Sequence, residues 1–116
     1  MAIILVVDDD RPARNTLVRI LELNGHTVLP FEDGRPALDE VDFSAVDLII
    51  SDFQMPMPGD EFVKELKRRS IDVPVIILSG ALDQDNTYTL SSLGVQRIMG
   101  KPFNLVEFLE VVEELA

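Results

Sequence analysis

The sequence predicts an α/β protein with an open, doubly wound sheet of five parallel strands and helices on both faces. Short aliphatic runs alternate with segments of helical periodicity, which indicates a repeated strand–helix unit with right-handed crossovers. Several runs are continuously apolar, as expected for strands buried on both faces of a parallel sheet. Five strands are too few for an eight-stranded barrel. The predicted strands are Ile3–Val7, Thr27–Phe31, Leu48–Ile50, Val73–Leu78 and Gln96–Met99.

The first predicted helix begins directly after Asp10, which we expect either to cap the helix or to lie on the surface. Pro12 falls in the first turn, where its missing amide hydrogen costs nothing. Gly25 ends the helix, because glycine readily adopts the left-handed conformation that follows a helix. The apolar stripe of this helix consists of Leu17, Ile20, Leu21 and Leu23.

Three helices of different strength are predicted in the middle of the chain. They run from Gly34 to about Val41, from Asp60 to Arg69, and from about Asp83 to Leu93. The helix from Asp60 places three apolar side chains inward: Phe62, Val63 and Leu66. The helix from Asp83 is the weakest, because it is rich in Asp, Asn, Thr and Ser, which are poor helix formers. We expect tertiary packing to hold it in place.

The last helix begins with a capping box formed by Asn104 and Glu107. Its apolar residues keep helical spacing, at Leu105, Phe108, Leu109, Val112 and Leu115. Val106 and Val111 lie off this stripe. We expect these two valines to be either ordinary exposed aliphatic residues or part of a surface that binds a partner.

Composition and charge exclude several classes of protein. The chain has 116 residues, 47% of them hydrophobic, so we expect residues 1–116 to form one domain with a real core. Ten Lys and Arg against 21 Asp and Glu give a net charge of −11, which argues against direct nucleic-acid binding. The lack of cysteine excludes a thiolate metal site. Without a signal peptide or a membrane-spanning stretch, the sequence predicts a cytoplasmic protein with no membrane contact.

Polar residues follow four of the predicted strands, at the edge of the sheet where ligands bind in such folds. Asp8 and Asp9 follow the first strand, Asp52 the third, Ser79 the fourth and Lys101 the fifth. Because neighbouring carboxylates repel each other, this group favours the binding of a cation. Oxygen ligands suit Mg²⁺, which keeps some of its waters and can bind phosphoryl oxygens. An aspartate beside such an ion is a plausible nucleophile toward phosphorus.

Four fragments of the chain together resemble the receiver domain of two-component response regulators. The fragments are Val6-Val7-Asp8-Asp9, Ser51-Asp52-Phe53-Gln54-Met55-Pro56, Leu78-Ser79-Gly80 and Lys101-Pro102-Phe103. Each fragment is weak evidence alone, but their order, their spacing and their positions after predicted strands all fit the family. The resemblance covers essentially the whole chain and implies a flavodoxin-like sheet with strand order 2-1-3-4-5.

The resemblance implies that Asp52 accepts a phosphoryl group from a phosphohistidine of a sensor histidine kinase or phosphotransfer protein. It also implies that Asp8 and Asp9 hold Mg²⁺ together with the Asp52 carboxylate and the backbone carbonyl of Gln54. Such a domain catalyses its own phosphorylation and slow hydrolysis and is not an enzyme in the usual sense. His26 lies at a helix–strand turn and is expected to be structural, so the donor histidine belongs to another protein.

Ser79 and Lys101 are implied to bind oxygens of the transferred phosphoryl group. Their movement toward these oxygens would pull on the loops before the fourth and fifth helices. The resemblance then implies that a downstream protein or output domain reads the face formed by the fourth helix, the fifth strand and the fifth helix. Whether the protein forms a homodimer stays open. The Lys101–Pro102 bond resembles one that is often cis in this family.

Two positions depart from the family pattern. The segment Met55–Asp60 is one residue shorter than the usual loop between Met-Pro and the turn glycine, which affects the placement of the Gln54 carbonyl. Ile98 stands where many receivers carry a Tyr or Phe that acts as a rotameric switch. An aromatic flip is therefore excluded, and any coupling must use shifts of the backbone and loops.

Two alternative functions remain open from the sequence. The first is a pseudo-receiver, a binding module that keeps the site residues but signals without phosphate. The second is a phosphatase of the haloacid-dehalogenase type, which also uses an Asp nucleophile and Mg²⁺. The segment Asp8–Pro12 lacks the Thr or Val of that family's motif, and 116 residues leave no room for a cap domain. The cognate kinase, the pathway and the output stay open.

Overall fold

The computed structural model describes residues 1–80 and 84–116 and contains one parallel sheet. Its strand order is β2-β1-β3-β4-β5, which confirms the predicted fold class and topology. The strands are β1 (Ile3–Val7), β2 (Thr27–Phe31), β3 (Leu48–Asp52), β4 (Val75–Ser79) and β5 (Arg97–Gly100). Because all strands are parallel, their carboxyl ends lie along the same edge of the sheet.

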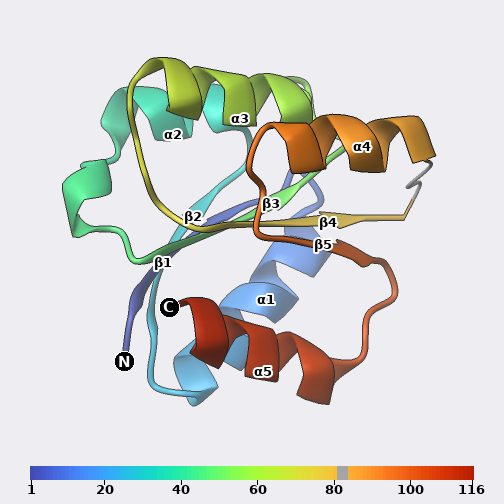
Figure 1. Ribbon diagram of the computed structural model, residues 1–116. Coiled ribbons are helices and arrows are strands. Elements are labelled where there is room, and N and C mark those ends of the chain that lie inside the picture. The colour runs from blue at the N-terminus through green and yellow to red at the C-terminus, as the bar shows by residue number, and fades with distance from the viewer. Residues whose placement is uncertain (81–83) are drawn as a thin grey trace.

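The helices cover both faces of the sheet (Figure 1). α1 and α5 lie on one face, and α2, α3 and α4 lie on the other. Their bounds are α1 (Arg11–Leu23), α2 (Gly34–Glu40), α3 (Gly59–Arg68), α4 (Gln84–Ser92) and α5 (Leu105–Leu115), with a short 3₁₀ helix, η1, at Phe43–Ala45. The predicted start of the fourth helix at Asp83 lies outside the described residues.

Three strands differ from their predicted bounds: β3, β4 and β5, of which β5 lies one residue later at both ends and β4 ends one residue later, at Ser79. Two of the other differences follow from hydrogen bonding. β4 begins at Val75 rather than at Val73, because Pro74 has no amide hydrogen to donate to the ladder. β3 extends to Asp52 instead of ending at Ile50, because Asp52 pairs with Leu78 of β4. This extension makes Asp52 the last residue of a central strand, where its backbone is fixed on the side of β4.

Helix α1 has the predicted ends. Asp10 is its N-cap, and the Asp10 carboxylate accepts a hydrogen bond of 3.3 Å from the amide of Ala13. Gly25 follows the C-cap with a φ of +88°, a conformation that favours glycine. Leu23 is 79% exposed, so its predicted place in the apolar stripe is wrong. It lies two residues after the buried Leu21, and a helix turns about 200° in that distance.

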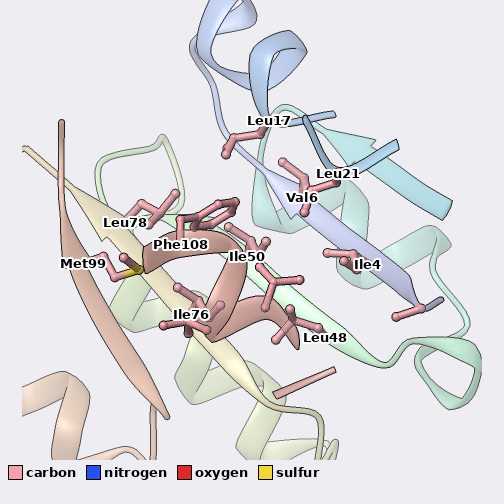
Figure 2. Packing of buried hydrophobic residues seen from close by; sticks show 13 residues of the cluster. Ile4, Val6, Leu17, Leu21, Leu48, Ile50, Ile76, Leu78, Met99 and Phe108 are labelled. Carbon is pink, nitrogen blue, oxygen red and sulfur yellow. The ribbon is translucent and has the colours of Figure 1, made fainter. Parts of the chain in front are cut away.

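Each face of the sheet has its own hydrophobic core, because successive strand residues point to opposite faces. Figure 2 shows the core beneath α1 and α5, where Phe108 and Leu21 pack over strand residues such as Ile50. The core on the other face contains Phe62, Leu66 and Leu90 from the helices, together with strand residues such as Ile77. The two cores fix the central strands from both sides, and thereby fix the loops that leave them.

The expectation that both valines of α5 lie off its buried stripe is wrong for one of them. Val111 is 8% exposed and belongs to the core beneath α1 and α5, because it lies three residues after the fully buried Phe108. Val106 is 66% exposed, which agrees with its place off the buried stripe. The predicted cap is present, since the Asn104 side chain accepts a hydrogen bond of 3.0 Å from the amide of Glu107.

Candidate functional site

Three carboxylates from two neighbouring strands meet at the carboxyl edge of the sheet. Asp8 and Asp9 directly follow β1, and Asp52 ends β3, the neighbour of β1. One oxygen from each carboxylate lies within 4.8 Å of the other two. Asp8 is buried, Asp52 is half-buried and Asp9 is exposed, so the group is open to solvent on the Asp9 side.

Four hydrogen bonds hold Asp8. Its amide donates to the carbonyl of Phe31 at 3.0 Å. Its Oδ1 accepts from the amide of Asp10 at 2.9 Å, and its Oδ2 accepts from Lys101 Nζ at 3.0 Å. Its carbonyl accepts from Arg14 Nη1 at 2.7 Å. These bonds fix the direction of the buried carboxylate before any ligand binds.

Arg14 is a site residue that the sequence reasoning missed. It lies in the first turns of α1, six residues after Asp8, and reaches back to the end of β1. Its guanidinium also brings a positive charge close to the acidic group. The signal in the sequence is weak, because a surface arginine on a helix is common and only the tertiary fold shows where it points.

Lys101 crosses the carboxyl edge of the sheet to reach the acids. Its Nζ lies 3.0 Å from Asp8 Oδ2 and 3.5 Å from Asp52 Oδ1, and its side chain is 26% exposed. Its own amide donates to the carbonyl of Ser79 at 2.8 Å, so β4 holds the lysine at its backbone. The Lys101–Pro102 peptide bond is cis, as the resemblance to receivers implied.

The charges of the site shift two pKa values in ways that follow from burial and neighbours. Burial raises the pKa of Asp52 above its ordinary value of 3.8; the Lys101 ammonium opposes this and the Asp8 carboxylate adds to it. Burial alone would lower the pKa of Lys101, but the hydrogen bond to Asp8 and the charge of Asp52 outweigh it and raise that pKa. Three carboxylates and one ammonium leave a formal charge of −2, which one divalent cation would neutralise.

The donor set of this site fits a hard divalent cation. Asp8, Asp9 and Asp52 supply carboxylate oxygens, which Mg²⁺ prefers over nitrogen and sulfur. Asp52 Oδ1 already accepts a hydrogen bond of 2.9 Å from the amide of Phe53. Gln54 lies two residues beyond Asp52, in the loop that leaves the acidic group, and its side chain is exposed.

Ser79 lies beside the acids at the end of the next strand. It is buried and ends β4, one residue beyond Leu78, which pairs with Asp52 across the sheet. Ser79 pairs in turn with Gly100 of β5, the residue before Lys101. The two residues predicted to bind a phosphoryl group therefore lie next to each other at the backbone level.

His26 lies at the amino end of β2, away from the carboxyl edge where the acids gather. Its buried ring accepts a hydrogen bond of 3.1 Å at Nδ1 from the amide of Ala2, and its Nε2 lies 3.3 Å from Glu113 Oε1. The ring thus joins the start of β1, the start of β2 and the end of α5. This environment fits the structural role expected from the sequence.

The geometry agrees with what comparisons with known proteins show. A family model for the response regulator receiver domain matches residues 4–113. The chain belongs to this family. The receiver is 36% identical over 107 residues to the response regulator MprA of Mycolicibacterium vanbaalenii, covering 91% of this chain and 46% of that protein. It is 35% identical over 112 residues to the DNA-binding transcriptional regulator NtrC of Escherichia coli, covering 96% of this chain and 24% of that protein.

Solved structures show the same fold along the whole receiver. The chemotaxis protein CheY4 of Vibrio cholerae superposes with a TM-score of 0.90 at 31% identity, covering 100% of this chain and 99% of that chain. The receiver domain of the Francisella response regulator 1452 gives a TM-score of 0.91 at 30% identity, covering 99% of this chain and 96% of that chain. The receiver spans about half or less of the length of the curated relatives MprA and NtrC.

Membership of this family has consequences for function at a coarse level. Receiver domains are signalling switches of two-component systems and not classical enzymes. They typically bind Mg²⁺ through acidic residues, and this receiver has the acidic cluster of Asp8, Asp9 and Asp52. Among the described helices, none is both long and apolar enough to cross a membrane.

Proposed function

We propose that residues 1–116 form one phosphoacceptor domain that is phosphorylated on Asp52 by a sensor histidine kinase or phosphotransfer protein. The observation that carries this proposal is the meeting of Asp8, Asp9 and Asp52 within 4.8 Å, with Lys101 Nζ 3.5 Å from Asp52 Oδ1. Such a site places a nucleophilic carboxylate beside a cation and a group of metal ligands, which is what in-line phosphoryl transfer needs.

Asp8, Asp9, the Asp52 carboxylate and the backbone carbonyl of Gln54 would hold Mg²⁺. When bound, the ion would offset the charge of the acidic group and polarise the phosphoryl oxygens that it binds. The hydrogen bonds to Asp8 keep its carboxylate in place, so little rearrangement is needed at the moment of binding. Exposed Asp9 leaves one side of the site open to the donor protein.

The transfer itself is one substitution at phosphorus. A free oxygen of the Asp52 carboxylate attacks, an O–P bond forms, and the P–N bond of the donor phosphohistidine breaks, which returns a neutral imidazole after proton uptake. Lys101 pairs with one oxygen of the transferred group, and the Ser79 hydroxyl donates a hydrogen bond to another. The phosphoryl group carries a charge of about −1.5 to −2 in place of the single negative charge of the Asp52 carboxylate, and it places that charge on three oxygens beyond the strand end, so these two donors are drawn toward it.

The signal would leave the site through the backbone. Ser79 and Lys101 are joined by the 2.8 Å hydrogen bond between the Lys101 amide and the Ser79 carbonyl, and they precede α4 and α5 respectively. A movement of either residue therefore shifts the face of α4, β5 and α5, which a downstream protein or output domain would read. Ile98 is partly buried and packs against the same core as Leu90. In this proposal it would transmit the shift by packing, because an isoleucine cannot make the aromatic flip.

Incubation with acetyl phosphate and Mg²⁺, followed by intact-mass measurement and peptide mapping, tests the proposal. We expect one phosphoryl adduct on Asp52 that is stable in acid and labile in base. The adduct should be absent in Asp52→Asn, suppressed by EDTA and retained in Asp39→Asn, a matched change on the exposed surface of α2. A modified Ser79, or a wild-type chain without an adduct, would contradict it, and the latter would favour a module that signals without phosphate.

A further inference from the structure

The loop that follows Asp52 is tied to a residue from a distant part of the chain. Asp33 lies directly before α2, and its Oδ1 accepts a hydrogen bond of 2.9 Å from the amide of Met57. Within the described part of the chain, the Asp33 carboxylate caps no amide of its own helix. A helix N-cap aspartate normally bonds in the first turn, so the side chain at this position serves the loop instead.

The sequence of the loop makes this one hydrogen bond important. Met57 stands between Pro56 and Pro58, and proline has no amide hydrogen. Met57 is therefore the single backbone donor of this three-residue stretch, and Asp33 accepts from it.

The rest of the loop is anchored close to Asp52. The amide of Phe53 donates to the carbonyl of Leu78 at 3.0 Å, and the carbonyl of Phe53 accepts from the amide of Gly59 at 2.8 Å. Gln54 lies between this anchor and the one at Met57. The position of the Gln54 carbonyl thus depends on the anchors at Phe53 and at Met57. The anchor at Phe53 consists of backbone hydrogen bonds, whereas the anchor at Met57 is a hydrogen bond to the Asp33 side chain.

Packing brings Asp33 within reach of the loop. Gly34 is buried, and a Cβ at its position would lie 2.7 Å from Phe62 Cδ1 and 3.2 Å from Met57 Sδ. Glycine allows this close approach of α2, α3 and the loop. The carbonyl of Phe31, two residues before Asp33, accepts from the amide of Asp8, so the same segment also supports the other side of the acidic group.

We propose that Asp33 is a positioning residue, which holds the loop after Asp52 through the Met57 amide so that the Gln54 carbonyl faces the metal. The proposal rests on the metal site of the proposed function. It assigns the role to the acceptor oxygen of Asp33 and not to its negative charge. An asparagine at position 33 should therefore preserve the function, whereas an alanine should not.

Calorimetric titration of the receiver with Mg²⁺ alone tests this role. Asp33→Ala should weaken Mg²⁺ binding by about three- to tenfold, the range expected for the loss of one hydrogen bond. Asp33→Asn and Asp39→Ala, the latter on the exposed surface of α2, should stay within about twofold of wild type. Equal affinity of Asp33→Ala and wild type, or an equal loss in the alanine and asparagine variants, would overturn the proposal.

A second measurement does not depend on the folding of any variant. In the wild-type receiver, the amide hydrogen of Met57 should exchange with solvent much more slowly than that of a free amide, because it is held in a hydrogen bond to the Asp33 carboxylate. Exchange at the rate of a free amide would overturn the proposal. A wild-type chain that binds no Mg²⁺ would overturn the proposed metal site and, with it, the role of Asp33. An affinity for Mg²⁺ that is the same in Asp33→Ala and wild type would overturn the role of Asp33 alone.

Discussion

Replacement of Lys101 by methionine is expected to destabilise the receiver when no divalent cation is present. Methionine keeps most of the aliphatic stem and removes the ammonium that lies 3.0 Å from Asp8 Oδ2 and 3.5 Å from Asp52 Oδ1. At 3.0 Å, the attraction to Asp8 alone is about 5 kcal/mol at an effective dielectric constant of about 20. Desolvation of the buried groups offsets much of this attraction.

The net loss follows from what the substitution leaves behind. Removing one partner of a fully buried ion pair costs about 3–5 kcal/mol, because the other charge stays buried without compensation. The Asp8 side chain is only 2% exposed, but Lys101 is 26% exposed and water can reach the space it leaves. We therefore expect a loss of about 2 kcal/mol in the free energy of unfolding for Lys101→Met.

Urea unfolding at pH 7 in EDTA measures this loss directly. Because the pKa of Lys101 is raised above its ordinary value of 10.5, its stabilising contribution is fully present at pH 7 and is lost only at alkaline pH. Lys64→Met is the matched control, since Lys64 is exposed and lies 3.8 Å from Glu61; it should change stability by less than about 0.5 kcal/mol. A Lys101→Met variant as stable as the Lys64 control would refute the reasoning.

Three further perturbations test other parts of the structure. Burial raises the pKa of Asp52, so Asp52→Asn should increase the free energy of unfolding at pH 7, and urea titrations should show this gain vanish as the pH falls below 3.8. Gly34→Ala should cost about 1–3 kcal/mol in thermal unfolding, because its Cβ would lie 2.7 Å from Phe62 Cδ1. Asp10→Ala should cost about 0.5–2 kcal/mol by the same assay, since it removes the cap of α1.

Each of these three expectations can fail in its own way. An Asp52→Asn variant less stable than wild type at pH 7 would mean that Lys101 stabilises the charged carboxylate more than burial penalises it. A stable Gly34→Ala variant would show that Phe62 moves away easily. An Asp10→Ala variant that matches wild type, where Asp10→Asn is the conservative control, would show that the 3.3 Å cap contributes nothing.

Much of the fold could be predicted because local patterns and the tertiary structure agree. The strands at Ile3–Val7 and Thr27–Phe31 have the predicted bounds, and the caps Asp10 and Asn104 lie where the sequence places them. Two misses have local causes, since Leu23 lies on the side of α1 opposite the buried Leu21 and Pro74 has no amide hydrogen to donate to β4. The miss at Val111 comes from packing. Val111 is buried because α5 presents more than one stripe to the core.

The acidic residues of the site could be proposed from their positions after predicted strands, since parallel strands bring their carboxyl ends to one edge. The supporting residues could not be found in this way. Arg14 reaches the Asp8 carbonyl, and Asp33 reaches the Met57 amide from 24 residues away. Both contacts depend on side-chain direction, which no periodicity in the chain encodes.

The order of apolar runs, turns and polar residues determined by itself that this chain folds as a receiver with five parallel strands, because burial and capping act locally on each segment. Only the tertiary structure decided the electrostatics of the site and the contacts that hold its side chains in place. The raised pKa of Asp52 depends on its distance from solvent, from Lys101 and from Asp8, and those distances exist only after β1, β3 and β5 have assembled into one sheet. Electrostatic interactions depend on separation in space, and separation in sequence carries little of that information.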